Sequence, residues 1–123
     1  MKESQDKREF SRVPLPFPVR LTHGETVVES DQGMDVSAIG LAIKTHEQIP
    51  VGSSCKVEIL LAEDMIITAE GLIVRELEDG MAIQITEITL SGYELLKHLI
   101  RFNSNDPARI DREFDQHLGL KAR

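Results

Sequence analysis

Two arginines near the start of the chain, Arg8 and Arg12, are the first residues whose types and spacing suggest chemistry. They lie four positions apart in the segment KREFSRVPLP, and Lys7 adds a third cation beside them. In an extended segment, residues four apart project to the same side, about 13 Å apart at ~3.3 Å per residue. Guanidinium groups bind phosphate in a bidentate fork and pair with O6 and N7 of guanine. The pair is therefore a candidate site for an anionic ligand, and a solvated, disordered terminus is the alternative interpretation.

A second polar group occurs in DVSAIG at 35–40. Asp35 and Ser37 are two residues apart, so they project to the same side of an extended chain. Gly40 permits a close backbone approach or a positive φ. The carboxylate can accept from the N1–H and amino group of guanine or orient an arginine, although an ordinary Asx or Ser turn explains this stretch taken alone. Together, the two stretches describe a site for an anionic purine nucleotide.

The charge of the chain limits its partners. The 123 residues carry a formal net charge of −7, which divides into +2 over residues 1–20 and −9 over the remainder. This field repels long polyanions such as duplex DNA. It still permits a small anion to bind at a local cluster of arginines.

Signals for an enzyme or a metal site are weak. The four histidines have no metal-ligand spacing, Cys55 has no CxxC partner, and no P-loop, G-x-S-x-G or H-E-x-x-H motif occurs. We therefore expect a buried, inert Cys55 thiol, no catalytic residues, no metal and no cofactor. One cysteine, no long apolar run and no secretory leader indicate a cytoplasmic protein without membrane insertion.

The elements that must position these residues are predicted to be mainly β-strands. Period-two alternation predicts six strands, over 17–22, 25–30 with a continuation toward Met34, 41–45, 55–61, 65–77 and 81–88. Pro14, Pro16 and Pro18 predict an extended lead-in that cannot be a central strand. Short antiparallel strands with one aliphatic core favour a closed or nearly closed six-stranded barrel.

The pattern becomes helical after the strands. LSGYELLKHLIRF at 90–102 has apolar residues at helical spacing, and Ser91 with Glu94 forms a capping box. A second helix is predicted from an Asp106 cap and Pro107 to a stop at Gly119, with an apolar stripe of Ile110, Phe114 and Leu118. We expect this stripe to pack on its own barrel, with binding to a partner or a second copy as the alternative. The expected division is a flexible arm over 1–12, a barrel with its helix over 13–103, and an amphipathic helix over 104–123.

R-x-x-x-R in a lead-in, followed by D-x-S-x-x-G and a run of strands, resembles the PilZ domain family over about residues 7–102. The resemblance implies a split β-barrel that binds cyclic di-GMP, a bacterial second messenger. The implied ligand-binding residues are Arg8 and Arg12 as the clamp, Asp35 and Ser37 on a guanine edge, and Gly40 leaving room. Lys7 stands where many relatives carry an arginine. Lysine keeps the charge but lacks the planar guanidinium, so it stays open whether the ligand binds as one molecule or as a stacked pair. Gly71 and Arg75 are expected to flank the site as secondary candidates.

The implied function is a bacterial cyclic di-GMP receptor or adaptor. Its arm, residues 5–13, is expected to fold against the barrel when the ligand binds and to signal to an effector protein. The alternative is a PilZ-like protein-interaction module that does not bind the nucleotide. The downstream process, the partner and the oligomeric state, a homodimer included, stay open.

Overall fold

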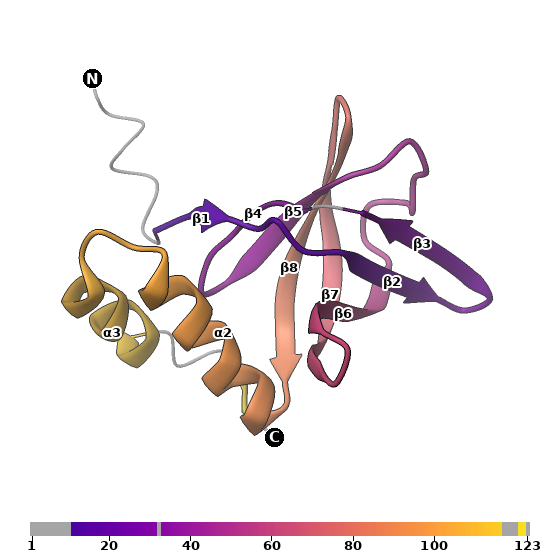
Figure 1. Cartoon of the computed structure of the whole chain (residues 1–123). Coiled ribbons are helices and arrows are strands. Elements are labelled where there is room, and N and C mark those ends of the chain that lie inside the picture. Colours follow the sequence, from indigo (N-terminus) through magenta and orange to yellow (C-terminus); the bar gives the residue numbers. More distant parts are fainter. Residues whose placement is uncertain (1–10, 32, 117–120, 123) are drawn as a thin grey trace.

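The computed structural model describes residues 11–31, 33–116 and 121–122 (Figure 1). The strands are β1 (Val13–Pro14), β2 (Val19–His23), β3 (Thr26–Ser30), β4 (Gly33–Val36), β5 (Gly40–Lys44), β6 (Ser54–Ala62), β7 (Met65–Leu77), β8 (Gly80–Ile88) and β9 (Lys121–Ala122). The helices are α2 (Leu90–Phe102) and α3 (Pro107–Gln116). They lie together on one side of the sheet, and α2 lies between α3 and the strands (Figure 1). Within the described residues, neither helix is long and apolar enough to cross a membrane.

The strands form one curled antiparallel sheet in the order β1-β4-β5-β8-β7-β6-β2-β3, and β9 pairs with β8 in parallel. The predicted mainly β architecture with C-terminal helices is confirmed, but the count of six strands is wrong, because eight strands form the antiparallel path. Prolines divide the lead-in strand into β1 and β2, and a break after Ser30 separates β3 from β4. The result is a half-barrel rather than the six-stranded barrel expected from the alternation.

The proline-rich segment between β1 and β2 alternates strictly between the core and solvent. Val13, Leu15 and Val19 are buried, whereas the three prolines between them are exposed. The segment also bridges β4 and β6, because Gly33 N donates to Phe17 O at 3.1 Å and Leu60 N donates to Pro18 O at 3.0 Å. Proline has no N–H to donate, so its outward position leaves no buried backbone donor unsatisfied.

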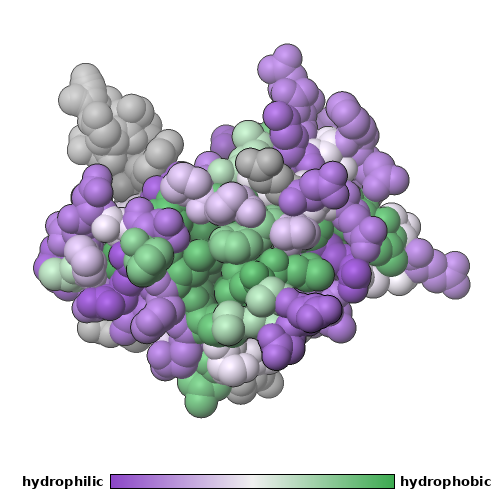
Figure 2. Space-filling model, in the orientation of Figure 1, coloured by the Kyte–Doolittle hydropathy of each residue, from purple (hydrophilic) through white to green (hydrophobic). Residues whose placement is uncertain are grey.

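The core is aliphatic, as the near absence of aromatic residues predicts. The period-two alternation that predicts the strands is matched by the burial of Leu41, Ile43, Cys55, Val57, Ile59, Met81, Ile83 and Ile85. Leu61 is only partly buried and packs against this core from its edge. Figure 2 shows hydrophobic side chains gathered across the middle of the face in view, with hydrophilic residues around them. This single core fixes which side of each strand faces inward and which faces outward.

Helix α2 covers the predicted residues, but its cap differs from the prediction. The N-cap is Thr89, whose Oγ1 accepts from Gly92 N at 2.9 Å, and not Ser91. The helix begins immediately after β8, so the residue at that junction takes the capping role. Leu96 and Ile100 on the buried face join the core.

Helix α3 begins as predicted, with Asp106 Oδ1 accepting from Arg109 N at 3.1 Å. Ile110 and Phe114 are buried, and the Phe114 ring meets Tyr93 of α2 edge-on at a centroid distance of 5.4 Å. Leu118 and Gly119, the other residues of the predicted stripe and stop, lie outside the described residues.

The segment 104–123, expected to be an amphipathic helix, contains a short strand as well as helix α3. Residues 121–122 form β9, which pairs with Glu87 and Ile88 of β8. The pairing of β5 with β8 ends at Gln84, so this part of β8 has an edge that β9 can join.

Candidate ligand-binding site

The register of the first strand brings the two polar motifs together. β1 pairs with β4 through Val13↔Val36, and one further step along this register places Arg12 opposite Ser37. The Arg12 side chain reaches Asp35 diagonally, with Nη1 2.7 Å from Oδ1. Both side chains remain about one third exposed, at 39% and 34%, so this ion pair is open to exchange with a ligand. Arg8 and Lys7 lie outside the described residues.

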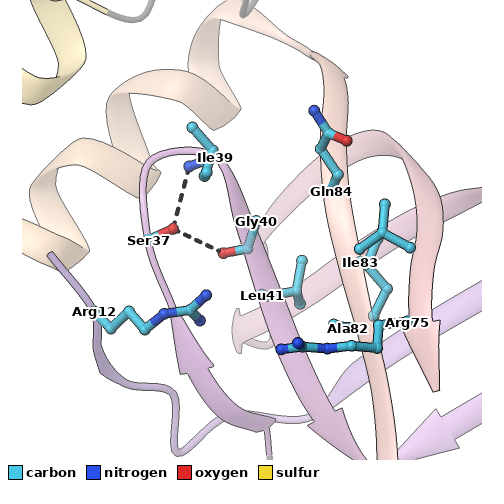
Figure 3. Close-up of a pocket in the computed structure, with 10 residues that line it drawn as sticks. Arg12, Ser37, Ile39, Gly40, Leu41, Arg75, Ala82, Ile83 and Gln84 are labelled. Atoms are coloured by element: carbon cyan, nitrogen blue, oxygen red, sulfur yellow. Dashed lines mark hydrogen bonds between the residues drawn. The ribbon is translucent and has the colours of Figure 1, made fainter. Parts of the chain in front are cut away.

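A hollow of about 430 Å³ lies beside this ion pair. Its lining comprises Arg12, Ser37, Ile39, Gly40, Leu41, Val74, Arg75, Ala82, Ile83 and Gln84. In Figure 3 the guanidinium groups of Arg12 and Arg75 point toward the same space from opposite sides. The volume lies within the range of about 300–1,000 Å³ that is typical of small-molecule sites. Two cations facing one concave surface can hold an anion there.

The loop from Ser37 to Gly40 is held by its own hydrogen bonds. Ser37 N donates to Gly40 O at 2.8 Å. The Ser37 hydroxyl also donates to Gly40 O at 3.5 Å and accepts from Ile39 N at 3.3 Å (Figure 3). The serine is only 2% exposed. This is the Ser turn that the sequence allowed as the simpler interpretation, and it gives the loop one fixed shape beside the hollow.

Gly40 is required by the close approach of strand β8. A Cβ added at Gly40 would lie 2.4 Å from the carbonyl oxygen of Ile83, which is much shorter than a van der Waals contact. The positive-φ glycines of the described residues are Gly24 and Gly52, so the positive φ considered for Gly40 is not observed. The glycine leaves room for β8, and the hollow borders that contact.

The two secondary candidates differ in position. Arg75 lines the hollow, and within the described residues it makes no ion pair. A register shift between Ile73 and Arg75 allows Val74 and Arg75 to line the same hollow although they are consecutive. Gly71 does not line it, because a Cβ there would point into the core, 2.6 Å from Ile83 Cγ2.

Gln84 is a polar lining residue that sequence reasoning did not select. It pairs with Gly40 across β5 and β8, and its side chain is exposed. In the sequence, Gln84 is recognisable only as an outward polar residue between Ile83 and Ile85. Solvent-exposed residues of other strands have the same pattern, so it does not indicate a binding role. Only the pairing of β8 with β5 distinguishes it.

The Cys55 thiol is buried, as expected. Burial, and to a lesser extent Glu70, raises the pKa of the Cys55 thiol from 9.0 to about 11, so the thiolate is scarce at neutral pH. Among the described residues, no three His, Cys, Asp or Glu side chains are grouped closely enough to hold a metal ion.

A second hollow of about 420 Å³ lies at the other end of β5. It is lined by Ser30, Asp31, Lys44, Thr45, His46 and Asp79. Two carboxylates face one lysine there, so its charge is opposite in sign to that of the arginine-lined hollow. This surface is not suited to an anionic ligand.

Comparison with known proteins places this geometry in a family. The family model for the PilZ domain matches residues 6–102. Among solved structures, the Bacillus subtilis inhibitor of motility MotI (DgrA) is 18% identical, with a TM-score of 0.62 over 90% of this chain and 53% of its own. The chain thus spans about half the length of MotI.

A second similar structure is the PilZ domain of CeSA from a cellulose-synthesizing bacterium. It is 18% identical, with a TM-score of 0.60 over 73% of this chain and 94% of its own. No curated protein matches the sequence. At these identities the two structures support the fold, whereas the family model covers most of the chain. The chain therefore belongs to the PilZ domain family.

Proposed function

We propose that this protein is a receptor for cyclic di-GMP that passes the signal to a partner protein. The PilZ family consists generally of cyclic di-GMP receptors and adaptors. The observation that carries the proposal is the convergence of Arg12, the Ser37–Gly40 loop and a second arginine, Arg75, at one hollow. Asp35 does not line the hollow, but it pairs with Arg12 at its edge. The ligand is an anionic purine dinucleotide. The hollow offers two guanidinium groups for its phosphates, and Asp35, paired with Arg12 beside the hollow, offers a carboxylate for a guanine edge.

The described residues have separate roles in this proposal. Arg12 binds a phosphate or a guanine, Asp35 accepts from a guanine edge, and Arg75 supplies a further cation from the opposite wall. Ser37 acts first by fixing the loop, because its hydroxyl already accepts from Ile39 N. Arg8 completes the clamp by the family resemblance, and Lys7 adds charge without the planar fork of arginine.

The energetics permit Arg12 to exchange Asp35 for the ligand. An ion pair as exposed as this one contributes about 0–1 kcal/mol to stability. Charge-assisted hydrogen bonds from a guanidinium to phosphate or guanine contribute about 1.5–3 kcal/mol each. Ligand contacts therefore outweigh the internal pair, which meanwhile holds Arg12 close to the position in which it is used.

The alternative, an interaction module without nucleotide, relied on the apolar stripe of the last helix. Its described members, Ile110 and Phe114, are 0% and 3% exposed and pack within the same chain. They are not available to a partner in this arrangement, so the stripe gives that alternative no support.

Isothermal titration calorimetry with cyclic di-GMP tests the proposal. We expect saturable binding by the wild type and loss of tight binding in Arg8→Ala and Arg12→Ala. The ligand-free melting temperature should change little in Arg12→Ala, because only an exposed ion pair is removed. Wild-type affinity in both variants would disprove the assignment of the site, and no binding by the wild type would disprove the function.

A further inference from the structure

Ser11, which lies inside the R-x-x-x-R motif, is held by the last helix. Its backbone N donates to Glu113 Oε1 at 2.9 Å, and its Oγ donates to Glu113 Oε2 at 2.9 Å. The two residues are 102 positions apart in the sequence. Both oxygens of one carboxylate are thus engaged by one residue of the arm, which fixes its backbone and its side chain together.

Glu113 is itself firmly placed. It is 5% exposed, and Oε2 also accepts from Arg109 Nε at 3.0 Å. The helix that carries it is anchored by the buried Ile110 and Phe114, and by an ion pair of Asp111 Oδ1 with Arg101 Nε of α2 at 2.8 Å. A buried carboxylate persists only where hydrogen bonds satisfy it, and the arm supplies two of the three found here.

This contact fixes the backbone next to Arg12. On one side of Arg12, Ser11 is bound to α3, and on the other, Val13 is 4% exposed and paired with Val36 of β4. Arg12 is therefore held from both sides while its side chain lines the hollow. Residues 11 and 12, which had been expected to belong to a flexible arm, rest against the folded domain because Glu113 and Asp35 hold them.

We propose that Glu113 is a positioning residue that binds Ser11 and so keeps Arg12 at the hollow, ready for the ligand. Its effect on affinity rests on the proposed function. The PilZ family match ends at residue 102, so the positioning group belongs to an added element, α3. Ligand affinity is then set in part by a helix outside the matched domain, and ligand binding in turn stabilises the contact between α3 and the arm.

Calorimetry with cyclic di-GMP tests the effect on affinity. Glu113→Ala should raise the Kd about tenfold, which corresponds to the cost of ordering the backbone of about one residue. Ser11→Ala, which leaves α3 intact, should raise it by less, because the backbone hydrogen bond remains. The double variant should bind no more weakly than Glu113→Ala alone, since both changes remove the same contact. Arg112→Ala, an exposed neighbour on the same helix, is the matched control and should bind as the wild type does.

Amide hydrogen exchange of the ligand-free protein separates this proposal from the proposed function. The Ser11 amide should exchange faster in Glu113→Ala than in Arg112→Ala, whether or not any nucleotide binds. If the wild type binds the nucleotide but Glu113→Ala and Ser11→Ala keep its Kd, Glu113 has no positioning role. If the wild type does not bind the nucleotide, the proposed function is overturned. The amide exchange rate of Ser11 then still shows whether Glu113 holds the arm. An unchanged Ser11 exchange rate in Glu113→Ala would overturn the positioning role of Glu113, whether or not the wild type binds the nucleotide.

Discussion

Two hollows of nearly equal size, about 430 and 420 Å³, lie at opposite ends of the β5–β8 pair. Gly40 borders the first hollow and Lys44 borders the second, so strand β5 connects them. The first presents Arg12 and Arg75, and the second presents Asp31 and Asp79 with the lysine. Size therefore does not distinguish them, but charge does.

The difference shows that an acidic protein can still present a locally cationic surface. The net charge of −7 would repel the ligand at long range, but the arginine-lined hollow reverses the sign of the field locally. Arg12 from the first predicted motif, and Ser37 and Gly40 from the second, line this hollow. The acidic hollow thus provides an internal control of equal volume for experiments on the arginine-lined one.

Charge reversal at each hollow should give the largest contrast. Arg12→Glu removes charge-assisted hydrogen bonds and places a second carboxylate beside Asp35, so we expect affinity for cyclic di-GMP to fall about 100-fold or more. Lys44→Glu makes the same kind of change at the acidic hollow and should leave the affinity unchanged in calorimetry at moderate salt. Equal losses in both variants would mean that the overall field, and not a local site, governs binding.

Closely packed glycines at the two ends of the β5–β8 pair provide the next test. A Cβ at Gly40 would lie 2.4 Å from Ile83 O, and a Cβ at Gly80 would lie 1.8 Å from Ile43 O. Alanine at either position must push β5 and β8 apart, so we expect each substitution to lower the free energy of unfolding by about 1–3 kcal/mol in urea denaturation.

The two glycine variants should nevertheless differ in binding. Gly40→Ala changes the wall of the arginine-lined hollow and should weaken cyclic di-GMP binding under conditions where the variant is fully folded. Gly80→Ala, at the far end, should not. Equal affinities for both folded variants would indicate that the ligand does not approach this part of β5.

Arg75→Ala should weaken binding less than Arg12→Glu does. Arg75 is exposed and supplies one cation from the opposite wall, so its removal should raise the Kd about tenfold, the equivalent of about one charge-assisted hydrogen bond. Arg75→Lys should recover part of that loss, because it restores the charge without the fork. If Arg75→Ala binds as tightly as the wild type, the anion occupies only the Arg12 side of the hollow.

The long strands were predictable because each has one buried face. β7 occupies the predicted residues 65–77, and β6 and β8 extend at most one residue beyond the prediction at either end. The strand count failed where local interruptions divide the chain, at the prolines before Val19 and at the break after Ser30. Alternation reports which side of a strand faces the core, but it does not report where pairing is interrupted.

The site was predictable only as motifs. Arg12 and Asp35 were singled out by residue type and family resemblance, and the β1–β4 register explains why they meet. The place of Arg75 depends on a bulge between β7 and β8. The alternation of inward and outward residues does not predict this bulge. Glu113 gave no signal, because a glutamate on an amphipathic helix has the pattern of a solvated residue.

By itself, the sequence determined the aliphatic core, the alternating strands, the two helices and the two motifs, because local spacing encodes periodicity and residue type encodes chemistry. Tertiary structure alone decided which of two equal hollows carries positive charge, and that Ser11 meets Glu113 across 102 positions. These outcomes depend on strand register and helix docking, which pair residues distant in the chain and so leave no local pattern to read.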